Sequence, residues 1–122
     1  MLRRAVVGMC LLAATGVRPG AAHHVVSLYD MRMPITINGV VSRVEWSNPH
    51  VYLYLSAKNG QGETEEWAVE LDSPSALVRH GWTRETVNAG DAVTCTGGRS
   101  KTGARSMKSA SVELAGGQKL KS

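Results

Sequence analysis

Residues 35–46, ITINGVVSRVEW, contain the pattern that decides the fold. The two isoleucines alternate with polar residues, which is typical of a β-strand with one buried face. Val44 and Trp46 continue the alternation on the opposite parity, after Gly39 has interrupted it. Because successive side chains of a strand point to opposite faces, the change of parity requires a bulge or a sharp coil at 39–42. We therefore expect one long, strongly coiled first strand.

Two more strands follow, joined by a short loop. His50–Ser56 (HVYLYLS) and Thr64–Leu71 (TEEWAVEL) both alternate, with aliphatic side chains on one face and tyrosines or glutamates on the other. The sequence KNGQG at 58–62 is typical of a hairpin loop. On the third strand we expect Glu66 and Glu70 to point outward as solvated surface residues.

A short helix and two further strands complete the pattern. Ser73 is a favoured N-cap, Pro74 suits the first helical position, and the helix SPSALVRHG ends at Gly81. Asp91–Thr96 and Ser109–Leu114 alternate as short strands. Three strands, a helix and two strands predict an all-β fold, a five-stranded OB-like β-barrel with one short helix. A split α+β sheet is the alternative.

The first 22 residues are predicted to be a signal peptide. Arg3 and Arg4 precede an apolar run of ten residues, which is too short to cross a bilayer as a stable helix, and small residues follow it. Cleavage is expected after Ala22; cleavage after Ala21 and retention as an uncleaved anchor are the alternatives. We expect a periplasmic or secreted bacterial protein that is not an integral membrane protein.

The remaining chain divides into three parts. Residues 23–34 form an N-terminal extension that docks on the barrel, residues 35–115 form the barrel, and residues 116–122 form a frayed tail. Within the extension, Met31 and Met33 are expected to pack on the core; thioether ligation of Cu(I) is the alternative.

Removal of the leader lowers the charge of the chain. The formal charge is +4, but the leader carries three arginines and no acidic residue, which leaves 11 basic and 10 acidic residues. A charge near +1 gives little attraction for nucleic acid, so we expect no nucleic-acid partner despite a basic loop at 97–108. Cys95 lies in a strand pattern and is expected to be a buried apolar side chain.

Several motifs resemble those of one family. They are AHH after the leader, W-x-N-P-H at 46–50 and S-P-x-x-L-x-x-x-G-W at 73–82. Together they resemble DUF6152, a family of small exported bacterial proteins of unknown function, over about residues 22–114. The resemblance implies an exported β-barrel and no particular activity. Val25 and Val26 replace the Ser-Phe pair that is usual after the histidines.

Two adjacent histidines, His23 and His24, follow the expected cleavage point. After cleavage behind Ala22, the new terminal amine and Nδ1 of His23 can chelate one metal ion, and another histidine can add a nitrogen. Cleavage behind Ala21 instead makes His24 the third residue of the chain, a position at which deprotonated backbone nitrogens can complete a square-planar copper site. Both possible amino termini therefore favour binding of Cu(II), which prefers near-planar nitrogen ligation. The alternative is a solvated histidine pair.

Further candidate residues lie in the first two strands. His50 follows a turn and is a candidate third copper ligand or a histidine that caps the turn, and Asp30 is a weaker oxygen ligand. Trp46, Tyr52 and Tyr54 are a possible ligand surface. No spacing typical of a hydrolase or phosphate-binding site is present, so we expect a metal-binding protein rather than an enzyme. A metal-free module that binds a ligand or a periplasmic protein is the alternative.

Overall fold

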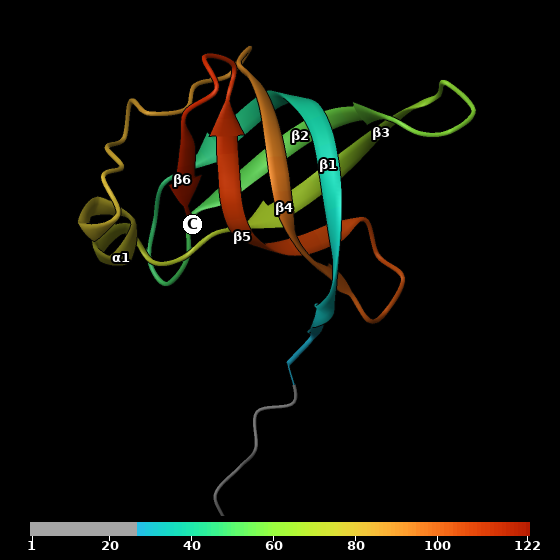
Figure 1. The fold of residues 1–122 in the computed structure, drawn as a ribbon, viewed down its shortest axis with the longest axis horizontal. Helices are drawn as coiled ribbons and strands as arrows, with labels where there is room; N and C mark the ends of the chain where they lie inside the picture. Colours follow the sequence, from blue (N-terminus) through green and yellow to red (C-terminus); the bar gives the residue numbers. More distant parts are fainter. Residues whose placement is uncertain (1–26) are drawn as a thin grey trace, which may run out of the picture.

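The computed structural model describes residues 27–122 and contains six strands and one short helix (Figure 1). The leader, His23 and His24 lie outside the described residues. The elements are, in chain order, β1 (Tyr29–Glu45), β2 (Tyr52–Lys58), β3 (Thr64–Glu70), α1 (Pro74–Arg79), β4 (Ala92–Ser100), β5 (Ser106–Leu114) and β6 (Lys119–Lys121). The predicted all-β class with one helix is confirmed. Across 27–122, no helix has the length and apolar character needed to span a bilayer.

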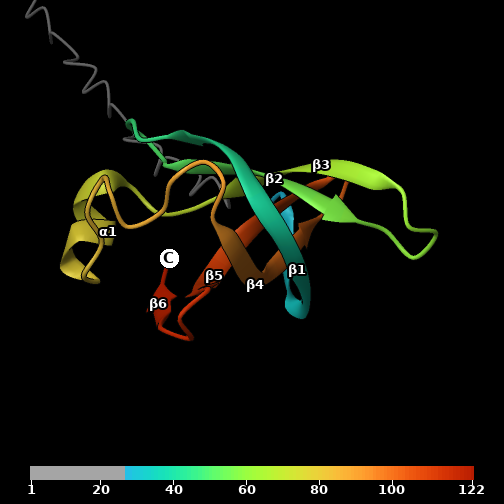
Figure 2. The same ribbon diagram turned by 90° about the horizontal axis from the view of Figure 1, so that it is seen from above.

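The strands form one curled sheet. Their order is β3-β2-β1-β4-β5-β6, and β3 also pairs in parallel with β5. Figure 2 shows β2 and β3 on one side of the molecule and β4 and β5 on the other. The core between them is made mainly of aliphatic side chains from the inner faces of the strands, with Leu77 of α1 and Trp82 at one end.

The change of parity in β1 is a β-bulge, as predicted. The register against β2 shifts between Val41 and Arg43, and Ser42 Oγ donates a hydrogen bond to a β2 carbonyl at 3.0 Å. Close packing at the bend requires glycine, because a Cβ on Gly39 would lie 2.8 Å from the carbonyl oxygen of Ser56. The bulge lets β1 pair with β4 along its first half and with β2 along its second.

The predicted hairpin loop and helix cap are also confirmed. Asn59 Oδ1 accepts hydrogen bonds from the backbone N–H groups of Gln61 and Glu63, at 2.9 and 3.0 Å. Ser73 Oγ accepts one from the N–H of Ala76 at 3.3 Å. These side chains satisfy backbone donors that the turn and the helix start leave unpaired.

The prediction that β1 begins at Ile35 is wrong. The strand begins at Tyr29, which pairs with Ser100 of β4, so residues 29–34 belong to the sheet and not to a separate extension. Residues 29–34 lack the apolar–polar alternation of a strand because their pairing with β4 is irregular between Asp30 and Pro34.

Met31–Met33 loop out of the β1–β4 ladder between Asp30, which pairs with Arg99, and Pro34, which pairs with Gly98. We call these three residues the Met-Arg-Met bulge. The two methionines are 45% and 74% exposed, so the prediction that both pack on the core is wrong. Three residues of β1 have no paired residue in β4 here. The sulfur of Met31 lies over Gly98 of β4, while Met33 is more exposed.

The predicted frayed tail is in fact a sixth strand. Lys119–Lys121 pairs with β5, and Leu120 packs against the core. Trp82 Nε1–H donates to the carbonyl of Lys121 at 2.8 Å, and Ser122 Oγ donates to Ser109 Oγ at 2.7 Å. A single apolar residue in a polar segment is too weak a signal to predict these contacts.

The last two long strands extend further than the sequence predicts. Gly97 and Gly98, assigned to a loop, belong to β4. A Cβ on Gly97 would lie 2.0 Å from the carbonyl oxygen of Lys108, so only glycine lets β5 approach this closely.

Candidate functional site

The candidate site is built around Glu70, the last residue of β3. Its Oε2 accepts hydrogen bonds from the hydroxyls of Tyr29 and Tyr52, at 2.9 and 3.0 Å. Its Oε1 lies 2.5 Å from Nδ1 of His50. We call Tyr29, His50, Tyr52 and Glu70 the Glu70 cluster. It joins the start of β1, the turn before β2, β2 itself and the end of β3.

The prediction that Glu70 is a solvated surface residue is wrong. It does lie on the outer face of β3, but its side chain is only 13% exposed because the two tyrosines and His50 cover it. Glu66, on the same face, is exposed as predicted. The alternation along β3 therefore predicted the correct face for Glu70, but not that other side chains bury it. A sequence signal was present, since a hairpin closed at 58–62 sets Tyr52 opposite Glu70.

The cluster fixes the charge state of its members. Burial alone raises the pKa of Glu70, but hydrogen bonds from Tyr29, Tyr52 and His50 outweigh burial, and the pKa of Glu70 lies below its usual value. Burial, and then the nearby Glu70, raise the pKa of Tyr52 to about 12 and also raise that of Tyr29. At neutral pH the carboxylate is therefore ionised and both phenols keep their protons.

His50 is oriented by this carboxylate. An ionised carboxylate can only accept hydrogen bonds, so the proton between the two groups is carried by Nδ1 of His50. In the neutral ring the other nitrogen, Nε2, then holds a lone pair. The side chain is 42% exposed. A carboxylate behind a histidine is the arrangement that orients histidine ligands in many metal sites.

The described residues do not complete a metal site by themselves. Within 27–122, no three or more His, Cys, Asp or Glu side chains are grouped so as to hold a metal ion. Asp30, a candidate oxygen ligand, instead pairs with Arg32 at 3.1 Å. His50 is thus a candidate ligand that needs partners from outside this range, and His23 and His24 lie there.

The predicted ligand surface is only partly assembled. Tyr52 and Tyr54 stack on the outer face of β2, with ring centroids 6.3 Å apart. The guanidinium of Arg43 lies 3.8 Å from the centroid of Tyr54, whose hydroxyl donates to Glu45 at 3.3 Å. Trp46 does not join them, because it packs against the core.

Cys95 is buried, as predicted. Its side chain has no exposed surface, and burial raises the pKa of its thiol to about 12. The thiol is therefore protonated and shielded, so it is a poor nucleophile and a poor metal ligand.

A surface groove of about 740 Å³ lies away from these residues. It follows the bend of β1 and is lined by residues such as Val40, Lys58, Ala92 and Glu113. It contains no member of the Glu70 cluster. We place the candidate site at the cluster, because there several side chains converge on one carboxylate, which directs the chemistry of His50.

Comparisons with known proteins give a fold relative and a family. Among the curated proteins, none matches this sequence. Among solved structures, the chain is similar to the mitochondrial single-stranded DNA-binding protein Rim1 of S. cerevisiae, with a TM-score of 0.52 and 14% identity over 68% of this chain and 93% of that one. At this identity the likeness concerns the fold alone. The profile of DUF6152, a family of unknown function, matches residues 11–109, and the chain therefore belongs to this family.

Proposed function

We propose that this chain is an exported, periplasmic binding protein that holds Cu(II) through its processed amino terminus, with His50 as a further ligand. It acts as a metal carrier or an accessory module and not as an enzyme. One observation supports this most directly: Tyr29 and His50 bind the same carboxylate, that of Glu70. The chain therefore enters the domain beside His50, the candidate histidine ligand.

The distance along the chain allows the site to close. His24 lies five residues before Tyr29. An extended chain covers at most about 3.6 Å per residue, so the Cα atoms of these residues lie within about 18 Å of each other. The terminal amine, the two imidazoles of His23 and His24 and Nε2 of His50 would form an all-nitrogen set that suits Cu(II).

The polar surroundings of His50 also favour this function. Glu70 holds the ring with Nδ1 protonated, so Nε2 needs no tautomer change before it binds a metal. Outer partners of this kind contribute about 10- to 100-fold to metal affinity in characterised sites. Tyr29 and Tyr52 hold the carboxylate in turn, which limits the rotation of the histidine.

Copper titration of the exported protein tests the proposal. The protein is purified from the exporting host, and its intact mass fixes the first residue and hence the choice between Ala22 and Ala21 as the cleavage point. We expect stoichiometric Cu(II) binding with a visible d–d band. With cleavage after Ala22, His23→Ala should abolish tight binding; with cleavage after Ala21, His24→Ala should do so. His50→Ala should weaken binding by at least about tenfold.

His80 provides the matched control, since it is the other histidine in the described chain. His80→Ala should leave copper affinity unchanged. One added residue before His23 should weaken a site that uses its amine. Equal affinity of the wild type and His23→Ala would rule the proposal out if the chain starts at His23, and equal affinity of the wild type and His24→Ala would do so if it starts at Ala22. A mass showing that both histidines have been removed would also rule it out.

We also propose that the fold is an OB-type barrel. The parallel β3–β5 pairing closes the sheet around the core, α1 lies between β3 and β4, and the chain is similar to a single-stranded DNA-binding protein. The sixth strand adds to the five that the sequence predicts. A closed sheet leaves few free edges, which suits a small domain with one cysteine in residues 27–122.

The second candidate is a metal-free interaction module. The stacked, half-buried pair Tyr52 and Tyr54, with the exposed Arg43 beside it, favours this function, because aromatic and guanidinium groups at a surface bind small molecules, glycans or protein partners. Failure of the copper titration, together with ligand-dependent changes in tyrosine fluorescence, would favour this module.

A further inference from the structure

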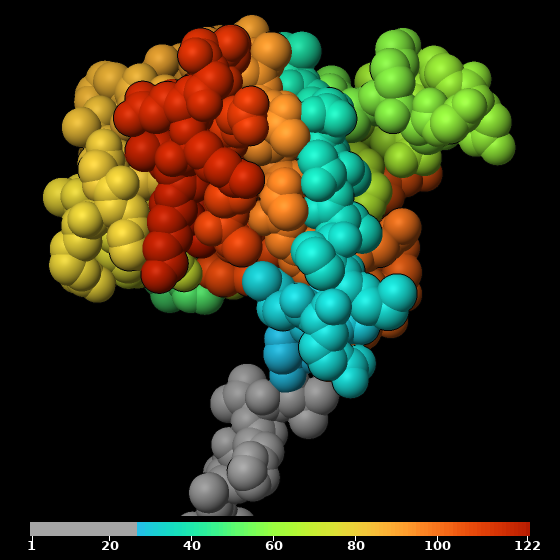
Figure 3. Space-filling model, in the orientation of Figure 1, coloured from blue at the N-terminus to red at the C-terminus, as the bar shows by residue number. Residues whose placement is uncertain are grey.

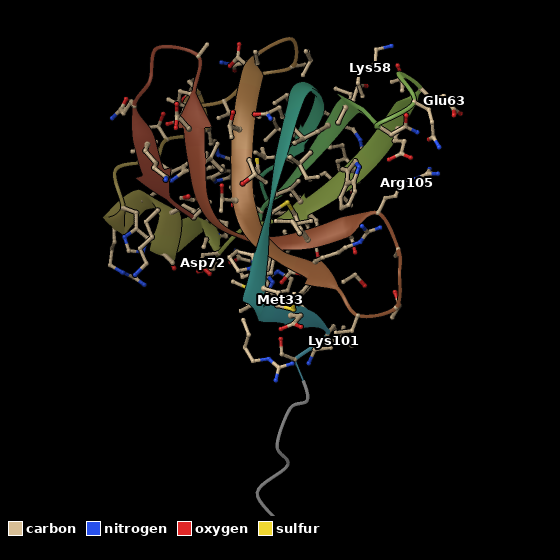
Figure 4. All side chains as sticks on the ribbon, turned by 45° about the vertical axis from the view of Figure 1, so that its right-hand side comes forward. Met33, Lys58, Glu63, Asp72, Lys101 and Arg105 are labelled. Atoms are coloured by element: carbon tan, nitrogen blue, oxygen red, sulfur yellow. The ribbon has the colours of Figure 1, made fainter. Side chains whose placement is uncertain are left out.

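The Met-Arg-Met bulge meets the loop between β4 and β5 at the end of the molecule where β1 begins. The backbone N–H of Lys101 donates to the carbonyl of Leu28 at 2.9 Å, which ties the two segments together. Figure 3 shows the start of β1 beside this loop, and Figure 4 shows Met33 and Lys101 close together at the same end.

Exposed apolar side chains gather at this end. The described chain has five strongly exposed large hydrophobic residues, and three of them, Leu28 (67%), Met31 (45%) and Met33 (74%), are here. The other two lie in the bend of β1 and on α1. Large apolar side chains concentrated at one tip of a small domain mark an interaction site more often than chance exposure does.

Positive charge surrounds these side chains. Arg32, within the bulge, is 86% exposed and pairs with Asp30. Glu70 also lies near this end, where it binds the hydroxyl of Tyr29. Lys101 is exposed and makes no ion pair within the described chain, and Arg99 lies beside it. Together, Arg32, Arg99, Lys101 and Asp30 carry a net positive charge.

A shallow groove of about 510 Å³ runs between the two segments. Its lining combines Met33, Pro34 and Ile35 with Arg99, Ser100 and Lys101, and with Asp30, whose carboxylate pairs with Arg32. An apolar floor with a cationic rim fits a molecule that has an acyl chain and a phosphate next to each other.

We propose that this end of the domain docks on the surface of an anionic phospholipid bilayer. Leu28 and the two methionines insert between the headgroups, while Arg32 and Lys101 lie at the level of the lipid phosphates. Protruding flexible apolar side chains and nearby cations are the combination that holds peripheral proteins at membranes. This docking is independent of copper and goes beyond the proposed function.

Vesicle sedimentation tests the docking. The exported protein is mixed with phosphatidylcholine vesicles that contain or lack phosphatidylglycerol. We expect binding to the anionic vesicles that weakens with added salt, since salt screens exposed charges. Lys101→Gln should lower the partition coefficient about fivefold, the usual effect of one basic residue at such a surface. Met33→Ser should lower it by a similar factor.

Two variants at other sites serve as matched controls. Lys119→Gln on β6 removes a charge, and Val78→Ser on α1 removes an exposed apolar side chain; both should bind as the wild type does. All variants share the same amino terminus, so any contribution from residues before Ser27 cancels. Copper titration of Met33→Ser should match the wild type, which separates this test from that of the metal site.

Three results would overturn the docking. They are no binding to anionic vesicles, equal binding to both vesicle types, or equal losses in the control variants and the bulge variants. Binding of an acidic protein by this end without any binding to vesicles would also overturn it.

Discussion

Replacement of Glu70 by glutamine should destabilise the domain strongly. The substitution keeps the shape of the side chain but removes the charge that accepts hydrogen bonds from Tyr29, Tyr52 and His50. Hydrogen bonds to charged groups contribute about 1.5–3 kcal/mol each. The amide oxygen can keep one or two of the three, but the amide NH₂ then faces another donor. We expect a loss of about 2–4 kcal/mol in the free energy of unfolding, a large part of the stability of a small domain.

Urea unfolding followed by tryptophan fluorescence measures this loss. Glu66→Gln is the matched control, because Glu66 lies on the same face of β3 but is exposed. Its effect should stay within about 0.5 kcal/mol, as for most surface substitutions. A Glu70→Gln variant within that same range at neutral pH would refute the role assigned to the cluster.

The pH dependence provides a second check on Glu70. Its pKa is lower in the folded state than in the unfolded chain, where a glutamate titrates at about 4.3. The stabilisation is therefore complete above that value and is lost as the pH falls through the folded-state pKa. The stability difference between the wild type and Glu70→Gln should shrink as the pH is lowered below about 4.3. A constant difference down to strongly acidic pH would contradict this reasoning.

Three further predictions concern single residues. The pKa of Tyr52, about 12, is raised above its unfolded value near 10, so its stabilisation is complete below pH 10 and is lost as the pH rises through about 12. An ultraviolet titration should show a phenolate that forms near pH 12 and is lost in Tyr52→Phe. Cys95 should resist a thiol reagent at pH 8 in the folded protein and react once urea unfolds it; rapid labelling of the native protein would contradict its burial. Gly97→Ala should cost roughly 3 kcal/mol or more in urea unfolding, because its Cβ would collide with the backbone of β5, whereas Gly116→Ala, which meets open space, should be nearly neutral.

The parts of the fold that sequence analysis predicted are those with local causes. The bulge in β1 follows from a change of parity, the hairpin from Asn59 and its neighbours, and the helix start from Ser73. Each depends on residues that lie close together in the chain. The sixth strand depends instead on Trp82, which is 39 residues from Lys121, and no local pattern records that contact.

The candidate site was predicted only in part for the same reason. His50 was singled out because it follows a turn, and the structure adds the carboxylate behind it. Glu70 looked like surface because alternation predicts the face of a strand and not what covers that face. Tyr29 covers it from 41 residues away, and its role could only be found once the strands were assembled.

The parallel contact between β3 and β5 has a consequence for how the chain acquires its fold. Residues 68–70 pair with β2 on one side, but their partners on the other side are residues 106–108, and β6 follows later still. A ribosome must therefore finish most of the polypeptide before the sheet can close, and topologies with such distant partners fold on the millisecond-to-second scale.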